Sequence, residues 1–250
     1  MTKVLLYSGG TDSWLIDKLW KPDVKLYINI HGRYSEEEMK LLSSDVKVID
    51  MPFLGATEIG KEAFVPLRNL YFLMIATTYG DEVCLGAVAG DIGCPDKTPK
   101  FLQDTEAIIN QCIGKETGKS PYTYKVCMDY VRKSKFELLG EYLKQGGDLD
   151  YFIKNTFSCH NPVNGKECWS CKCCYKKFLQ GVYYGYDFGE EADKKMIQYF
   201  IDVEFSNDNG SKYFIFDRPK EGKPMKVAVK KLFDKYGLDL EKYICNIKTR

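Results

Sequence analysis

The sequence has no apolar run that approaches the roughly 20 residues needed to span a bilayer. It also has no excess of one charge, because 36 Lys and Arg residues stand against 35 Asp and Glu residues. The first absence disfavours a membrane-spanning protein, and the second removes the basic footprint typical of nucleic-acid binding. Because the sequence begins with a strand-like run, we expect no signal peptide. We therefore expect a cytoplasmic globular protein with no membrane or direct nucleic-acid partner.

Two familiar nucleotide-binding motifs are missing as well. There is no G-x-x-x-x-G-K-[S/T] sequence, and no G-x-G-x-x-G sequence follows the first apolar run at residues 3–7. That run is followed by SGGTDS at residues 8–13, and residues 14–20 then show helical spacing. The hexapeptide therefore occupies a strand-to-helix turn. Unpaired N–H groups at a helix start, permissive glycines and hydroxyl donors together favour phosphate.

Asp12 is the unusual member of this turn. A carboxylate beside phosphate is repulsive unless a divalent cation such as Mg²⁺ lies between them. The six residues also fit an ordinary turn in which the Ser and Asp side chains cap the helix. Phosphate binding with Mg²⁺ is the interpretation we favour.

Short apolar runs alternate with helical patterns through the first part of the chain. The expected strands are residues 3–7, 24–30, 46–49 and 82–85. The expected helices are residues 36–42, 68–79, 105–112 and 135–145. This alternation predicts an α/β fold, with a Rossmann-like parallel sheet and helices on both faces. Ligands of such sheets bind beyond the carboxyl ends of the strands, where the hexapeptide falls.

The character of the sequence changes after residue 188. Two further helices are expected at residues 190–201 and 227–236, and residues 206–224 are expected to form a turn, a strand and a loop. We predict three parts: an α/β domain that carries the phosphate-binding turn at residues 1–150, a cysteine-rich segment at 151–188 and a C-terminal appendage at 189–250.

The chain contains ten cysteines and no export signal, which points to a reducing compartment. Cys168, Cys171 and Cys174 are spaced C-x-x-C-x-x-C, and Cys159 lies just upstream. Four thiolates satisfy tetrahedral Zn²⁺ in a closed, structural site. His160 is an alternative ligand, and an iron–sulfur cluster or disulfides are the alternative chemistries. Nearby lysines would offset the charge of such a site: Lys166, Lys172, Lys176 and Lys177.

With both patterns in view, the sequence resembles the N-type ATP pyrophosphatases, and within them the 7-cyano-7-deazaguanine synthase family. The resemblance covers roughly residues 1–185 and implies the fold of the adenine nucleotide alpha hydrolases. It rests, in order, on SGGTDS, on VPLRNLYFLMIA at 65–76, on GAVAGDIGCPDKTPKF at 86–101, on Lys135 in KSKFELL, and on the cysteine cluster.

The resemblance implies that AMP is transferred from ATP to a carboxylate with release of pyrophosphate. It implies that Asp12 holds Mg²⁺ and that Arg68 and Lys135 neutralise phosphate charge. The residues implied to cradle the nucleotide are Ser8, Gly9, Gly10, Thr11, Ser13 and Asn69. Those implied on the acid-binding side are Asp91, which is also a catalytic candidate, and Asp96, Lys97 and Phe101. The implied cofactors are ATP, Mg²⁺ and Zn²⁺, and a homodimer is the implied assembly.

The match departs from the family on the acid-binding side. The family usually reads tyrosine-Pro-Asp-cysteine-arginine where residues 94–98 read CPDKT. Lys97 can pair with an acid as a point charge but lacks the fork of an arginine. Three hypotheses follow: a synthase that uses ammonia to form an amide or a nitrile, a ligase that couples the deazaguanine acid to a protein amine as in antiviral (CBASS-type) systems, or an inactive nucleotide-binding scaffold.

Overall fold

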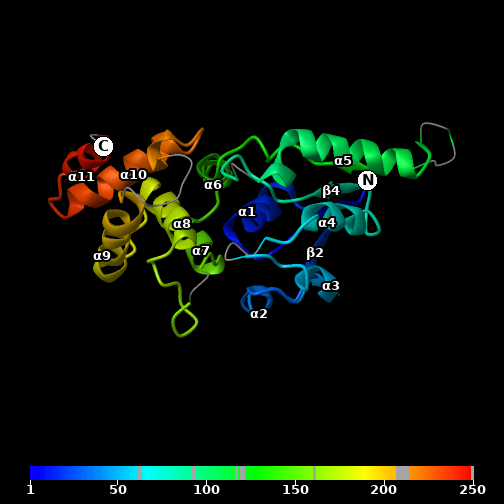
Figure 1. Ribbon diagram of the computed structural model, residues 1–250, viewed down its shortest axis with the longest axis horizontal. Helices are drawn as coiled ribbons and strands as arrows, with labels where there is room; N and C mark the ends of the chain where they lie inside the picture. The colour runs from blue at the N-terminus through cyan, green and yellow to red at the C-terminus, as the bar shows by residue number, and fades with distance from the viewer. Residues whose placement is uncertain are drawn as a thin grey trace. The chain divides into compact units, whose positions relative to one another are not determined.

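The computed structural model consists of two compact units, Met1–Ser134 and Lys135–Arg250 (Figure 1). It describes residues 1–60, 64–91, 94–115, 118, 122–159, 162–206 and 214–248, with side chains to residue 244. None of the helices in these ranges combines the length and the apolar character needed to cross a bilayer. The predicted division into three parts is not the same as these units and stays a prediction.

The first unit is built on a five-stranded sheet in which every pairing is parallel. The strands are β1 (Lys3–Leu6), β2 (Val24–Asn29), β3 (Val46–Asp50), β4 (Glu82–Cys84) and β5 (Lys125–Val126). Their order is β3-β2-β1-β4-β5. The four expected strands are confirmed, and β5 was not predicted because two residues carry no periodic pattern.

The helices of the first unit follow the strands. They are α1 (Thr11–Trp20), α2 (Ser35–Met39), α3 (Pro52–Gly55), α4 (Arg68–Ala76) and α5 (Pro99–Cys112), with a short 3-10 turn η1 (Pro95–Lys97) before α5. Helix α5 begins earlier than predicted. Pro99 suits a first helical turn, and the Thr98 hydroxyl caps the helix by accepting from Phe101 N.

Both faces of β1 are covered. Val4 and Leu6 pack with Leu73 and Ala76 of α4 in one buried cluster. Leu5 points to the opposite face, since side chains alternate along a strand, and it is fully buried too. The predicted α/β sheet is therefore confirmed. Because the chain runs from β1 to β2 on one side and returns to β4 on the other, the loops after β1 and β4 leave the sheet at its topological switch point.

The second unit is helical in its described part. Its elements are α6 (Lys135–Lys144), α7 (Leu149–Asn155), α8 (Lys172–Tyr183), α9 (Glu190–Tyr199), a π-helical turn η3 (Phe200–Glu204), a 3-10 turn η4 (Ile215–Asp217), α10 (Gly222–Lys235) and α11 (Leu240–Lys248). Large aromatic side chains fill its core: Tyr175, Phe178, Phe200 and Phe233 are fully buried.

The strand expected within residues 206–224 is wrong for the part that the structure describes. Ile215 is fully buried and begins a 3-10 turn. No sheet in the described residues of this unit offers it a partner. The chain then folds tightly onto the start of α10, where a Cβ on Gly222 would lie 1.9 Å from the Phe216 carbonyl oxygen. Only glycine fits that contact.

Candidate nucleotide site and cysteine cluster

The loop after β1 is closed by the side chain of Ser13, which is buried. The Ser13 hydroxyl accepts from Ser8 N at 3.2 Å and donates to the Gly10 carbonyl at 3.2 Å. The Ser8 and Ser13 hydroxyl oxygens lie 3.3 Å apart. Gly9 has a φ of +72°, a left-handed conformation that favours glycine. The hexapeptide is thus a preformed loop in which Ser13 orders the turn.

Helix α1 begins at Thr11, with Gly10 extended at its N-cap. Within the described chain no side-chain hydrogen bond caps this terminus. The ordinary capped turn, which was the alternative interpretation, is therefore not what forms here. The positive end of a ten-residue helix faces the loop, and Asp12 lies in its first turn. Such a terminus favours an anion.

The loop after β4 lies directly against the loop after β1. Gly86 has a φ of +75°. A Cβ at this position would lie 3.5 Å from the Leu6 carbonyl oxygen and 3.9 Å from Ser13 Cβ. Two segments that carry the family resemblance, although more than seventy residues apart, therefore meet at the switch point of the sheet.

Two pairs involve the acid-binding candidates, one of them with Asn69 of the implied nucleotide cradle. Lys97 Nζ lies 3.2 Å from Asp91 Oδ2, and both side chains are partly buried. Asn69 is 3% exposed and donates to Asp96 Oδ2 at 2.8 Å, which ties α4 to η1. Phe101 packs against the core cluster of the first unit. Asn69 thus orders the segment that carries Asp96, and Lys97 already has an anionic partner.

Arg68 begins α4, and its guanidinium lies 6.0 Å from the ring centre of Phe72. Burial raises the pKa of the Glu38 carboxyl on α2, while a hydrogen bond from Tyr27 and the charge of Arg68 lower it. The Arg68 guanidinium therefore acts electrostatically on the Glu38 carboxyl of α2.

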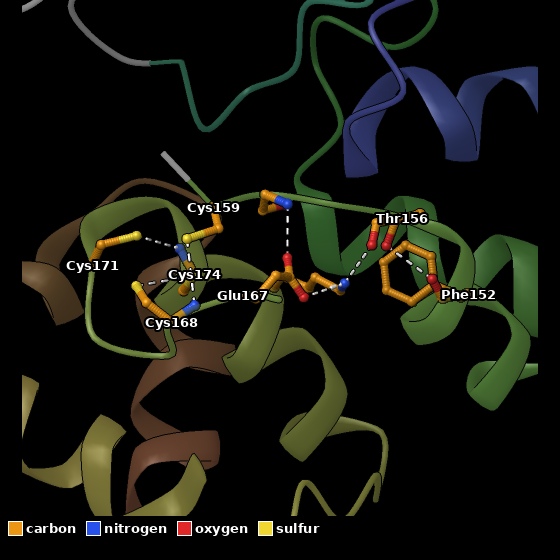
Figure 2. Close-up of polar contacts among 9 residues, drawn as sticks. Phe152, Thr156, Cys159, Glu167, Cys168, Cys171 and Cys174 are labelled. Atoms are coloured by element: carbon orange, nitrogen blue, oxygen red, sulfur yellow. Dashed lines mark hydrogen bonds and ion pairs between the residues drawn. The ribbon is translucent and has the colours of Figure 1, made fainter. Parts of the chain in front are cut away.

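The four predicted metal ligands come together in the second unit. The Sγ atoms of Cys159, Cys168, Cys171 and Cys174 all lie within 4.8 Å of one another (Figure 2). Those of Cys168 and Cys174 are 3.9 Å apart. Four sulfurs at about 2.3 Å from a tetrahedral centre are about 3.8 Å apart, so the set fits Zn²⁺. His160, the alternative ligand, lies outside the described residues.

Backbone N–H groups point at three of these sulfurs. Cys168 N donates to Cys159 Sγ at 3.4 Å, Ser170 N to Cys168 Sγ at 3.4 Å, and Cys174 N to Cys171 Sγ at 3.5 Å. The neighbouring Cys171 sulfur and burial raise the pKa of the Cys174 thiol well above its ordinary value. Sulfurs crowded in this way are held as thiolates by a bound cation, which is the reason that such clusters take metal.

A buried ion pair supports the cysteine cluster and was not predicted as a pair. Lys177 is 1% exposed, and its Nζ lies 2.6 Å from Glu167 Oε2 and 2.6 Å from the Thr156 carbonyl oxygen. Glu167 Oε1 accepts from Ser158 N at 2.7 Å (Figure 2). The pair therefore bonds to Thr156 and Ser158, and it ties together the segments that lead into Cys159 and Cys168.

Lys135 opens the second unit as the first residue of α6 and is 7% exposed. Its carbonyl oxygen accepts from Gln180 Nε2 on α8 at 2.7 Å. The Cys171 sulfur and burial raise the pKa of the Cys173 thiol, and the charges of Lys176 and Lys135 lower it. The ammonium of Lys135 is therefore within electrostatic reach of the first turn of α8.

The family described as queuosine biosynthesis protein QueC matches residues 37–179, more than half of the chain. The chain belongs to the QueC family. It is 26% identical over 208 residues to 7-cyano-7-deazaguanine synthase 1 of Desulfitobacterium hafniense, covering 70% of this chain and 88% of that protein. It is 29% identical over 176 residues to the 7-cyano-7-deazaguanine synthase of Picrophilus torridus, covering 63% and 70%. With the synthase of Leptospira interrogans it shares 34% identity over 119 residues, covering 44% and 46%.

Proposed function

We propose that this QueC-family protein is an ATP-dependent adenylating ligase that converts a 7-carboxy-7-deazaguanine-type acid into an amide or a nitrile. One observation carries the proposal: the uncapped start of α1, with its preformed SGGTDS loop, lies against the Gly86 loop at the switch point of a parallel sheet. An anion-binding turn at that place suits the phosphates of ATP. The family membership and the synthase names of the relatives support it.

The proposed chemistry begins at a carboxylate, whose own charge repels nucleophiles. Transfer of AMP from ATP to the carboxylate releases pyrophosphate, and ammonia then attacks the acyl carbon so that the C–O bond to AMP breaks and the amide forms. The nitrile would require a second ATP, which activates the amide oxygen so that it can leave. The loop residues from Ser8 to Ser13 would hold the pyrophosphate, and Arg68 and Lys135 would offset the charge that develops on phosphate. Asp12 would hold Mg²⁺, which supplies charge neutralisation between the carboxylate and the phosphates. Much of the remaining catalysis would come from positioning ATP and the acid in line with each other.

The acid would be bound beside the pair of Asp91 and Lys97. Lys97 offers one point charge to the substrate carboxylate, and Asp91 holds its ammonium in place at 3.2 Å. A family member with arginine would offer two parallel hydrogen bonds instead. We therefore infer that this chain binds the acid at the same loop but through a single charged contact, with ammonia as the amine.

The test is to incubate the protein with ATP, Mg²⁺, 7-carboxy-7-deazaguanine and ammonium, and to follow pyrophosphate release and product mass. An amide or nitrile product is expected. ATP turnover without a small-molecule product, together with a mass adduct on a neighbouring protein, would show a protein amine as acceptor. No turnover by the folded protein would contradict the proposal.

Asp12→Asn is the decisive variant. It removes the charge proposed to hold Mg²⁺, so activity should fall by at least about a hundredfold, the range that loss of one electrostatic group costs at an active site. The thermal unfolding midpoint should change little. Asp104→Asn, in the exposed Lys100–Asp104 pair of α5, is the matched control and should keep full activity.

A further inference from the structure

Two cysteines of the first unit lie at the carboxyl ends of β4 and β5. Val83 pairs with Val126 in the parallel register, and the ladder continues one residue further, where Cys127 N donates to the Val83 carbonyl oxygen at 2.8 Å. Cys84 and Cys127 are therefore neighbours on adjacent segments. Adjacent strands lie about 4.8 Å apart, which is within the range of about 4.4–6.8 Å between the Cα atoms of a disulfide.

The side chains of these two cysteines also share one face of the sheet. Val83 and Val126 pack in the core cluster on the other face. Side chains alternate along a strand, so Cys84 and Cys127, the next residues of the two segments, point away from that cluster together. Both cysteines are free, and they are 2% and 7% exposed. The two thiols therefore lie where a disulfide can form without a change of register.

The two thiols differ chemically. The Cys84 thiol donates a hydrogen bond to the Cys127 sulfur, and the Asp129 N–H donates to the same sulfur. These two bonds lower the pKa of Cys127, against burial and the charges of Asp129 and Glu82, which raise it. The same contact and burial raise the pKa of Cys84. Since the thiolate is the reactive form of cysteine, Cys127 is the nucleophile of the pair, and Cys84 is the thiol that keeps its proton.

We propose that Cys84 and Cys127 form a redox site that hydrogen peroxide converts into a disulfide. A nucleophilic thiolate beside a second thiol is the arrangement typical of redox-sensing cysteines. Hydrogen peroxide is a small oxidant, which suits a sulfur atom with little exposed surface. The reaction needs no nucleotide and no other substrate, so the proposal does not depend on the proposed function.

The reaction has two steps. The Cys127 thiolate attacks one peroxide oxygen, so that an S–O bond forms, the O–O bond breaks, and the hydroxide that leaves takes up a proton to become water. The Cys84 sulfur then attacks the sulfenic sulfur of Cys127, so that the S–S bond forms, the S–O bond breaks, and a second hydroxide leaves with the Cys84 proton as water. Two thiols are oxidised to one disulfide, and one peroxide is reduced to two waters.

The disulfide would join two loops at the edge of the sheet. The Gly86 N–H donates to the Cys84 sulfur, and the loop that contains Gly86 lies against the loop after β1. Ala89 N donates to the Lys133 carbonyl oxygen at 2.8 Å, so the loops after β4 and β5 are already connected at one point. A disulfide connects them at a second point and so restricts the loop that packs against SGGTDS.

The test treats the reduced full chain with a small excess of hydrogen peroxide, blocks the remaining thiols with iodoacetamide and digests the protein with trypsin without reductant. Mass spectrometry should find the peptide of residues 126–132 linked to that of residues 69–97. Fragmentation should place the bond at Cys84 and not at Cys94, and dithiothreitol should separate the peptides. Cys112→Ser, which removes an exposed thiol of α5, is the matched control and should keep the link.

Two variants of Cys84 test the roles of the two thiols. Cys84→Ser keeps a hydrogen-bond donor for the Cys127 sulfur but cannot form the disulfide, and Cys84→Ala removes the donor as well. In Cys84→Ser the sulfenic acid of Cys127 should persist, and dimedone should capture it about threefold faster than in Cys84→Ala, the effect of one hydrogen bond. Circular dichroism is recorded for each variant, and if either fails to fold, the link in the natural chain decides.

A folded natural chain that stays unlinked after peroxide treatment would overturn the proposal. A disulfide that joins Cys127 to a cysteine other than Cys84 would overturn it too. Equal capture of Cys127 by dimedone in the two folded variants would contradict the assignment of Cys84 as the donor to the nucleophile.

Discussion

A buried ion pair beside the cysteine cluster joins two charged side chains, Lys177 and Glu167. The Lys177 ammonium was expected only to offset the sulfurs, but the structure pairs it with Glu167 in the protein interior. Burial lowers the pKa of Lys177 and raises that of Glu167, so each charge depends on its partner. Removing one partner of such a pair leaves the other buried and uncompensated.

Lys177→Met should therefore destabilise the protein by about 3–5 kcal/mol, measured by urea unfolding of the zinc-loaded chain. It should also weaken zinc retention about tenfold or more against a chelator, because groups behind the ligands orient them. Lys154→Met, which breaks the exposed pair with Asp150 on α7, is the control and should change neither quantity appreciably. Equal effects of the two variants would contradict this account of the buried pair.

At the scale of elements, regular patterns were predictable and local exceptions were not. The strands from β1 to β4 and the helix α4 follow from their apolar runs. By contrast, β5 is too short to show a period, and the 3-10 turn η4 forms in an aromatic stretch whose sequence suits a strand equally well. Packing within the second unit determines the conformation of η4, and a local sequence pattern does not reveal that packing.

The α6–α8 contact allows a sharp test of packing. Gly140→Ala should cost about 1–3 kcal/mol in urea unfolding, because its Cβ would displace the Tyr184 hydroxyl. In a Tyr184→Phe background that oxygen is absent, and the same change should be nearly neutral or stabilising, since alanine favours a helix over glycine by about 1 kcal/mol. An identical cost in both backgrounds would show that the hydroxyl is not the obstacle.

At the scale of the molecule, the sequence predicts which residues belong to the candidate sites, but not which of them contact one another. The hexapeptide and the four cysteines are local motifs, so their residues could be named from spacing. Three contacts depend on how the chain folds back on itself: Asp91 with Lys97, Glu167 with Lys177, and Gln180 with the Lys135 carbonyl. Residue spacing alone does not predict such contacts. The Lys177–Glu167 pair beside the cysteine cluster therefore could not be predicted from the sequence.

The two units contain separate hydrophobic cores, and only the second includes cysteine ligands. Removing zinc with a chelator should therefore lower hydrogen-exchange protection mainly within residues 135–244, because structural zinc sites contribute folding free energy directly. Protection of β1, β2 and β4 should stay close to that of the untreated protein. Uniform loss across both units, measured by mass spectrometry, would contradict this separation.

The core that surrounds Tyr175 and Phe178 is completed by side chains from far beyond the matched family region, among them Phe200 and Phe233. A shortened gene product that ended with residue 185 would leave those aromatic rings of α8 facing water. Such a product would aggregate or be degraded before it turned over any substrate. The residues after 185 therefore belong to the shortest segment of the second unit that can enclose its own core.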